Sequence, residues 1–166
     1  MIARYSRPEM SALFEDEARY RTWLEVEIAV TEALERRGEA PSGTAARLRS
    51  GARIDSARID EIESTVRHDV IAFLTQVGET VGKDARYLHV GMTSSDLVDT
   101  ALALTLVRAI DLLLREVDRL LEQTRRLALD HKDTVMVGRT HGIHAEPITF
   151  GLKVLVWDQE LRRARE

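Results

Sequence analysis

Apolar residues recur at intervals of three and four along most of the chain, which is the spacing of amphipathic helices. The pattern predicts an extended segment at residues 1–8, followed by a helix over residues 8–37 whose apolar face carries Trp23, Leu24 and Ile28. A turn at residues 40–43 follows. Further helices are predicted over residues 44–49, from Asp55 or Ser56 to residue 66, and over residues 70–81.

The longest predicted helix begins at Ser94 or Ser95 and continues to about residue 131 without Pro or Gly. At 1.5 Å per residue it would be roughly 50 Å long. Its part from Ala101 to Leu114 is apolar at all but three positions. A helix that is apolar on nearly every side must be surrounded by other helices. Few partners exist within 166 residues, so we expect other subunits and further chain to cover it.

The last elements are a short extended piece at residues 135–137, a glycine-rich segment, and a helix that begins near Pro147 or Thr149 and still continues at Glu166. We therefore predict an all-α fold with a short extended segment near residues 134–140. The expected organisation is a helical N-terminal domain over residues 1–92 and an incomplete helix-bundle domain, used for oligomerisation, over residues 93–166.

Composition and charge narrow the function classes. Ala, Leu, Arg and Glu dominate, as in proteins built of long helices. A net charge of −4 argues against nucleic acid as the main partner. The chain has no cysteine, and it shows neither a signal peptide nor an apolar run long enough to span a membrane. A soluble cytoplasmic protein is the expectation.

The segment from Gly138 to Pro147 is the main candidate for chemistry. It places two histidines, a threonine, an arginine and a glutamate between two glycines and a proline, a composition poorly suited to a core. Imidazole titrates near neutral pH, so the segment indicates proton transfer or anion binding. A companion segment at residues 87–96 has the same character. Together they favour an enzyme that acts on small anionic substrates.

Three histidines, His68, His89 and His141, each follow an element boundary and have polar neighbours. Three such imidazoles fit a site that binds anions and transfers a proton, although any one of them alone could be an ordinary surface histidine. His141, His144 and Glu146 do not have the spacing of a helical zinc site, so no metal is predicted.

Thr93-Ser94-Ser95-Asp96 opens the longest predicted helix. One of these residues is expected to cap the helix, and the remaining hydroxyls with the positive helix end can bind a carboxylate. Arg4 and Tyr5 lie in the extended arm. Arginine suits phosphate or carboxylate recognition, but a surface arginine is the more common reading of Arg4 taken alone.

Read together, four segments resemble the adenylosuccinate lyases of the fumarase/aspartase superfamily. The segments are residues 4–6, residues 67–69, residues 89–100 and residues 138–151. The resemblance spans essentially the whole chain in the right order. Argininosuccinate lyases and fumarases share the architecture but carry different residues around Thr93-Ser94, and the Thr140-His141 pair argues against the related cycloisomerases.

The resemblance implies a β-elimination that splits adenylosuccinate into AMP and fumarate and treats the succinylated aminoimidazole carboxamide ribotide likewise, without a metal or organic cofactor. It implies that His141 is the catalytic acid, with Thr140 as a substrate contact. Thr93 and Ser94 match positions that hold the succinyl part, and His89 matches a histidine near the phosphate. Positions on the nucleotide side are matched by Arg4, Tyr5, Arg67, His68 and Asp69.

The resemblance also implies what this chain lacks. Members of the family carry a flexible serine-containing loop, which supplies the base, well beyond the region seen here. Their active sites combine residues from three subunits of a homotetramer. We therefore expect an N-terminal part that is inactive alone. Two alternatives stay open: another lyase of the superfamily, such as argininosuccinate lyase, and a non-catalytic helical assembly module.

Overall fold

The computed structural model describes residues 2–166, and these residues are almost entirely helical apart from one β-hairpin. The predicted all-α fold is thereby confirmed. The chain divides into two compact units, of which the first ends at Ala109 and the second begins at Ile110. This division falls inside the longest helix, whereas the domain boundary expected from the sequence, at residues 92/93, precedes that helix and remains a prediction.

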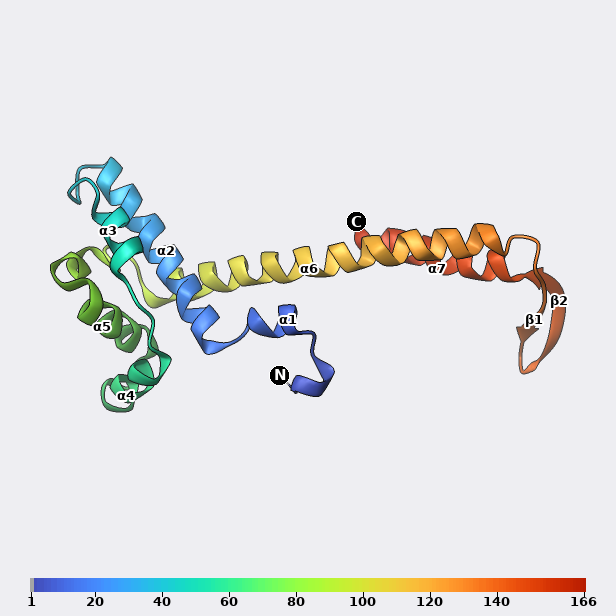
Figure 1. Ribbon diagram of the computed structural model, residues 1–166, viewed down its shortest axis with the longest axis horizontal. Coiled ribbons are helices and arrows are strands. Elements are labelled where there is room, and N and C mark those ends of the chain that lie inside the picture. The colour runs from blue at the N-terminus through green and yellow to red at the C-terminus, as the bar shows by residue number, and fades with distance from the viewer. Residues whose placement is uncertain (1) are drawn as a thin grey trace. The chain divides into compact units, whose positions relative to one another are not determined.

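The elements of unit 1 are η1 (Ala3–Tyr5), α1 (Pro8–Ala12), α2 (Asp16–Arg36), α3 (Thr44–Gly51), α4 (Ser56–Val66), α5 (Asp69–Val81), η2 (Gly82–Tyr87) and the first part of α6 (Ser94–Asp130), where η denotes a 3-10 helix. Unit 2 consists of the rest of α6, the strands β1 (Val135–Thr140) and β2 (Ile143–Thr149), and α7 (Phe150–Arg165) (Figure 1). Most predicted helices are confirmed to within a few residues.

Two expectations for the N-terminus were wrong. Residues 1–8 were expected to be extended, but residues 3–5 form the short helix η1. The helix expected over residues 8–37 is two helices, because the chain turns between α1 and α2: the Phe14 N–H bonds the Ser11 carbonyl, and Glu15 takes an extended conformation. Asp16 and Glu17 then stand in the first turn of α2, where the helix dipole favours carboxylates.

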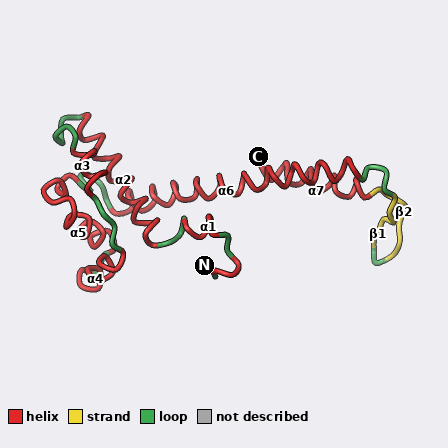
Figure 2. The backbone as a smooth tube through the Cα atoms, in the orientation of Figure 1, coloured by secondary structure: helices red, strands yellow, loops and turns green. Residues whose placement is uncertain are grey.

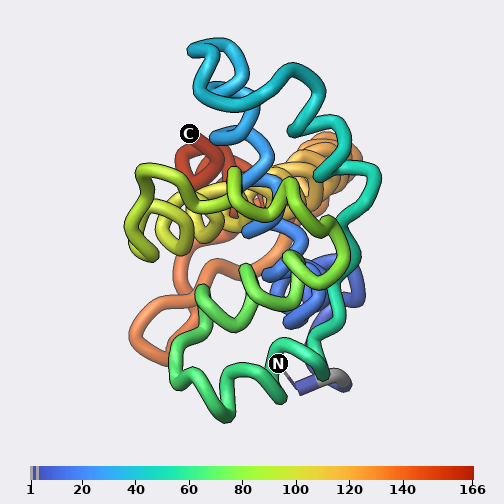
Figure 3. Tube along the Cα trace, turned by 90° about the vertical axis from the view of Figure 1, so that its left-hand side faces the viewer, coloured from blue at the N-terminus to red at the C-terminus, as the bar shows by residue number. Residues whose placement is uncertain are grey.

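The core of unit 1 is built around three aromatic rings. Tyr20 and Trp23 of α2 meet Phe73 of α5 with ring centroids 5.4 to 5.9 Å apart, in stacked and edge-to-face arrangements. Each of these side chains is buried. Helices α4 and α5 pack side by side, and α3 packs on α2 (Figures 1 and 3). Burial of these rings gives unit 1 a hydrophobic core of its own.

The short helix η2 is fixed to α3 by an ion pair. Arg47 of α3 donates to both carboxylate oxygens of Asp84, at 2.7 and 3.3 Å, and Asp84 is buried. This bond to the guanidinium holds the pKa of the Asp84 carboxyl below its usual value. The pair therefore anchors the segment that leads directly into Leu88 and His89.

A β-hairpin connects α6 to α7 in unit 2 (Figure 2). Thr140 pairs with Ile143, so His141 and Gly142 form a two-residue turn, and both have positive φ, +50° and +73°. Positive φ at both central residues is the requirement of a type I′ turn. The sequence predicted β1 but not β2, because the next helix was expected to begin near Pro147 or Thr149, whereas the structure pairs residues 143–149 with β1.

The two helices of unit 2 approach closely at Gly151. The Gly151 N–H bonds the carbonyl of His131 at 2.9 Å, and the Phe150 N–H bonds that of Thr134 at 2.8 Å. A Cβ on Gly151 would lie 2.3 Å from the Ala128 carbonyl oxygen and 2.7 Å from the Lys132 Cα. Only glycine fits at this crossing.

One broad apolar surface of α6 is uncovered. Leu102, Leu106, Val107, Ile110 and Leu113 are all about half exposed, as are several apolar residues of α7. The sequence predicted that this helix needs partners. Within the described residues no helix is long and apolar enough to cross a membrane.

We predict that Gly151→Ala lowers the free energy of unfolding by about 3 kcal/mol, because the new methyl group would collide with backbone atoms that cannot rotate away. Gly51→Ala is the matched control, since its Cβ would meet only Val81 at 3.8 Å. Urea titration of both variants measures the difference. Equal stability of the two variants would contradict the close approach.

Candidate functional site

The residues predicted to form the site fall in both units. Unit 1 carries Arg4, Tyr5, Arg67, His68, Asp69, His89, Thr93 and Ser94, and unit 2 carries Thr140 and His141. All of them lie at or next to the ends of helices or strands. Among residues 2–166, no hydrogen bond or ion pair joins the residues 67–69 to His89 or to Thr93-Ser94. The three segments of unit 1 are thus positioned independently.

Arg67, His68 and Asp69 form the junction between α4 and α5. Arg67 closes α4 in the left-handed conformation, with φ at +56°. His68 caps α5, with Nδ1 at 3.5 Å from the Ile71 N–H, and Asp69 accepts from its neighbour Val70 at 2.7 Å. The imidazole and the carboxylate are each about half exposed and lie 3.4 Å apart. The junction therefore presents a cation, an imidazole and a carboxylate to the outside.

His89 is held by a buried carboxylate of α2. Oε1 of Glu27 lies 2.8 Å from the His89 Nδ1, and Oε2 accepts the His89 backbone N–H at 2.6 Å. Glu27 is completely buried, and the His89 side chain is 17% exposed. Like Arg67, His89 has a positive φ, +60°.

The sequence reasoning did not select Glu27, although a signal was present. Glu27 follows Trp23 by four residues and precedes Thr31 by four, so it occupies the buried face of α2. A charged residue on that face requires a partner, because an unpaired buried carboxylate is strongly unfavourable. The partner stands 62 positions later in the chain, which periodicity alone does not identify.

Thr93 and Ser94 stand at the start of α6. Asp96 accepts the Thr93 backbone N–H at 2.8 Å, which is one half of a capping box. The expected capping of this helix is therefore present, with Asp96 as the capping side chain. Thr93 is exposed and Ser94 half-buried, so both hydroxyl residues border the positive end of the α6 dipole.

Arg4 and Tyr5 lie in η1 and are exposed, with the guanidinium 5.7 Å from the centre of the tyrosine ring. Thr140 and His141 lie at the exposed tip of the hairpin. The His141 imidazole is therefore exposed on a two-residue turn, where a ligand or another chain can contact it.

Arg67, His89 and His141 share a backbone feature. Within residues 2–166 they are the non-glycine residues with positive φ. This conformation is uncommon for residues with a Cβ, and it concentrates at functional sites, where the surrounding structure enforces it. All three are residues that the sequence predicts for the site, and they share the conformation that functional residues often adopt.

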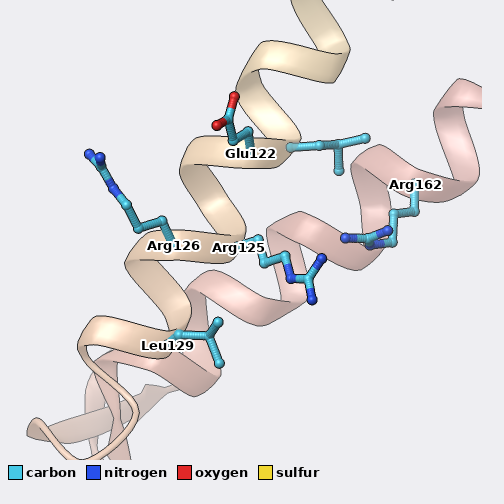
Figure 4. Close-up of a pocket in the computed structure, with 6 residues that line it drawn as sticks. Glu122, Arg125, Arg126, Leu129 and Arg162 are labelled. Carbon is cyan, nitrogen blue, oxygen red and sulfur yellow. The ribbon is translucent and has the colours of Figure 1, made fainter.

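Two hollows of the described surface differ in whether a predicted site residue lines them. One of about 380 Å³ lies between α6 and α7 and is bordered by Arg125, Arg126, Arg162 and Glu122, as Figure 4 shows, and it contains none of the predicted site residues. Another, of about 370 Å³, lies beside Arg67. Within the described residues, no group of three or more His, Asp or Glu side chains could hold a metal ion.

The chain is similar in sequence to known adenylosuccinate lyases. The chain is 49% identical to adenylosuccinate lyase from Bacillus subtilis strain 168 and 51% identical to that from Synechocystis sp., in each case over the whole chain. The chain spans 38% of the length of each of these relatives, at their N-terminal end. The resemblance inferred from the motifs is confirmed.

Solved structures show the same fold. A 3-carboxy-cis,cis-muconate lactonizing enzyme from Pseudomonas putida superimposes with a TM-score of 0.89 at 32% identity, covering 98% of this chain and 39% of that one. A fumarate lyase from Mesorhizobium sp. BNC1 gives 0.87 at 30% identity, covering 96% of this chain and 39% of that one. A family model described as lyase matches residues 3–166. Because this match takes in nearly every residue, the chain belongs to the lyase family.

Proposed function

We propose that the protein containing this chain is an adenylosuccinate lyase, which eliminates fumarate from adenylosuccinate to give AMP and from the succinylated aminoimidazole carboxamide ribotide. The observation that carries the proposal is the identity of 45 to 51% to adenylosuccinate lyases over the whole chain. The positive φ of Arg67, His89 and His141 supports the choice of site residues.

The chemistry accounts for the types of residue involved. In a β-elimination, a base removes a proton beside a carboxylate, and negative charge builds on that carboxylate. We propose that Thr93 and Ser94, at the positive end of the 37-residue helix α6, bind the succinyl part and stabilise this charge. Donors that are already in place stabilise this developing charge, and they thereby lower the barrier to proton removal.

The departing nitrogen must receive a proton. We assign this step to His141, whose exposed imidazole on the hairpin tip can act as a general acid near neutral pH. Thr140 beside it is a substrate contact. The nucleotide side of the substrate is assigned to Arg4, Tyr5, Arg67, His68 and Asp69, and the phosphate to His89. The proposed reaction uses protein groups alone, with neither a metal nor an organic cofactor.

The base is assigned to a segment outside these 166 residues, as the resemblance implies, so the chain alone is proposed to be inactive. Since the chain spans 38 to 39% of its relatives, the tests below use a full-length protein that contains it. We also propose a cytoplasmic homotetramer. The half-exposed apolar residues of α6 support assembly, because such a surface is unfavourable in water.

We predict that the full-length protein releases fumarate from adenylosuccinate and not from argininosuccinate. Product formation with each substrate at equal concentration measures this. Activity on argininosuccinate alone would identify a different lyase of the superfamily. Activity on neither substrate, from a folded full-length protein, would favour a non-catalytic assembly module.

We predict that His141→Ala lowers kcat by about 100-fold or more, the usual scale of acid catalysis. His144→Ala is the matched control, because His144 is equally exposed on the neighbouring strand and is assigned no role. We expect its kcat to be near that of the parent protein. A near-normal rate for His141→Ala would remove His141 from the catalytic role.

We predict that Leu113→Glu disrupts the tetramer, because it places a charge in the uncovered apolar surface of α6, where Leu113 is 56% exposed. Lys83→Glu introduces the same side chain at an exposed position outside α6 and should leave the assembly intact. Light scattering gives the solution mass of both. An unchanged mass for Leu113→Glu would show that this surface is not an interface.

We predict that Arg67→Gly raises the free energy of unfolding by about 0.5–1 kcal/mol while lowering activity at least about tenfold. Glycine relieves the left-handed conformation, but it removes the guanidinium assigned to the nucleotide. Arg67→Ala should lose activity equally without the gain in stability. If Arg67→Gly retained full activity, the strained arginine would have no functional role.

A further inference from the structure

Helix α2 contains a buried carboxylate that the proposed reaction does not use. We propose that Glu27 is a positioning residue, which holds the Nδ1–H of His89 and so directs Nε2 toward the substrate. Phosphate oxygens only accept hydrogen bonds, so Nε2 must also carry a proton for this contact, and the Glu27 carboxylate balances the positive charge of the doubly protonated ring. The inference rests on the proposed function only for the identity of that substrate.

The two oxygens of Glu27 are both engaged with one residue. Oε2 accepts the His89 backbone N–H at 2.6 Å, and Oε1 lies 2.8 Å from Nδ1 of the same residue. The carboxylate thus fixes the backbone and the ring of His89 together. This two-point attachment determines the direction of the imidazole more tightly than a single hydrogen bond would.

Thr31 extends the attachment by one helical turn. Its hydroxyl is fully buried and lies 3.3 Å from the Tyr87 carbonyl and 2.9 Å from the Glu27 carbonyl. Helix α2 therefore contacts the segment 87–89 at two successive turns, through two buried polar side chains. These contacts hold His89 in its left-handed conformation, with φ at +60°, which is otherwise unfavourable.

The chemistry of the carboxylate determines which ring nitrogen faces it. An ionised carboxylate only accepts hydrogen bonds, so Nδ1 must carry the proton that it shares with Oε1. A histidine whose Nδ1 donates to a carboxylate presents Nε2 on the opposite side of the ring. The His89 side chain is 17% exposed, so solvent or a ligand reaches part of it. Since Glu27 itself is fully buried, it acts on the substrate only through His89.

The placement of the charge also indicates a role beyond packing. A carboxylate with no exposed surface is unfavourable unless it is paired, and an apolar side chain of similar size would be easier to accommodate on the buried face of α2. The partner of Glu27 is one of the three histidines selected as site residues. The buried charge is therefore explained if its function is to hold that histidine.

Kinetics of the full-length protein test this inference through Glu27→Gln. The amide that replaces the carboxylate can donate to Nδ1, which leaves the ring with a single proton, on Nε2, and removes the negative charge that balances a doubly protonated ring facing the phosphate. We expect KM for adenylosuccinate to rise about tenfold, with kcat changed by less than about threefold. Loss of a contact made equally in the ground state and the transition state has this signature.

Glu25→Gln is the matched control, because Glu25 lies on the same helix and pairs with Arg108 instead. It should leave both constants unchanged.

A double-mutant cycle separates positioning from an independent role. If Glu27 acts through His89, Glu27→Gln adds nothing to the rise in KM produced by His89→Ala. Effects of the two substitutions that multiply in the double variant would overturn the inference, as would an unchanged KM in Glu27→Gln.

Nitrogen NMR of the parent protein, labelled at histidine, tests the protonation of the His89 Nδ1 without relying on activity. The His89 signals, assigned by their loss in His89→Ala, should show a protonated Nδ1. An unprotonated Nδ1 would overturn the inference. A protonated Nδ1, together with no effect of His89→Ala on kinetics, would support the positioning of His89 while removing His89 from the proposed substrate site.

Discussion

The uncovered apolar surface of α6 is the constraint on which the rest of this protein depends. Helix α6 supplies part of the core of unit 1 through Leu97 and Ala101, yet apolar residues such as Leu102, Leu106 and Leu113 remain about half exposed. Monomeric soluble proteins rarely expose an apolar surface of this kind, because its contact with water is unfavourable. The constraint supports the proposed tetramer, in which copies of α6 and the rest of the full-length chain would cover this surface.

The proposed site depends on the same helix at both of its ends. Thr93 and Ser94 begin it, and the chain that follows it forms the hairpin with Thr140 and His141 at the tip. The structure places each group of residues within its own unit. In the proposed tetramer, a site completed by neighbouring copies would give assembly a role in catalysis as well as in stability.

Buried contacts lie behind two of the candidate residues, His89 and His141. The Arg47–Asp84 pair anchors η2, and Glu27 and Thr31 hold the segment that follows it. In unit 2 the type I′ turn fixes His141, and the contact of Gly151 with the end of α6 fixes the hairpin. The backbone of these two proposed site residues is thus held by buried polar contacts and by close packing.

The helices could be predicted from the sequence because their signals are local. Apolar spacing located α5 and α6, and the caps Asp55 and Thr149 accept backbone N–H groups at the starts of α4 and α7. The break between α1 and α2 was missed because no Pro or Gly marks it. The exposed strand β2 was missed because Pro147 and Thr149 were read as the start of the following helix.

The candidate site was less predictable from the sequence than the helices were. Polar residues at element boundaries, read with the family resemblance, selected His68, His89 and His141. Glu27 could not be assigned a partner, because its contact with His89 joins residues 62 positions apart. Long-range pairing of this kind depends on tertiary packing, which the local pattern of a single sequence does not predict. The proposed roles of the site residues remain predictions.

Mixing two impaired variants tests the central claim, that one active site takes its residues from different copies. Full-length His89→Ala and His141→Ala proteins would be dissociated, mixed and reassembled, and the rate of fumarate release from adenylosuccinate measured at low substrate concentration. The account predicts that mixed tetramers recover a substantial part of the parent activity, because some sites then receive both intact histidines. No recovery, once mass measurements establish that subunits have exchanged, would contradict it.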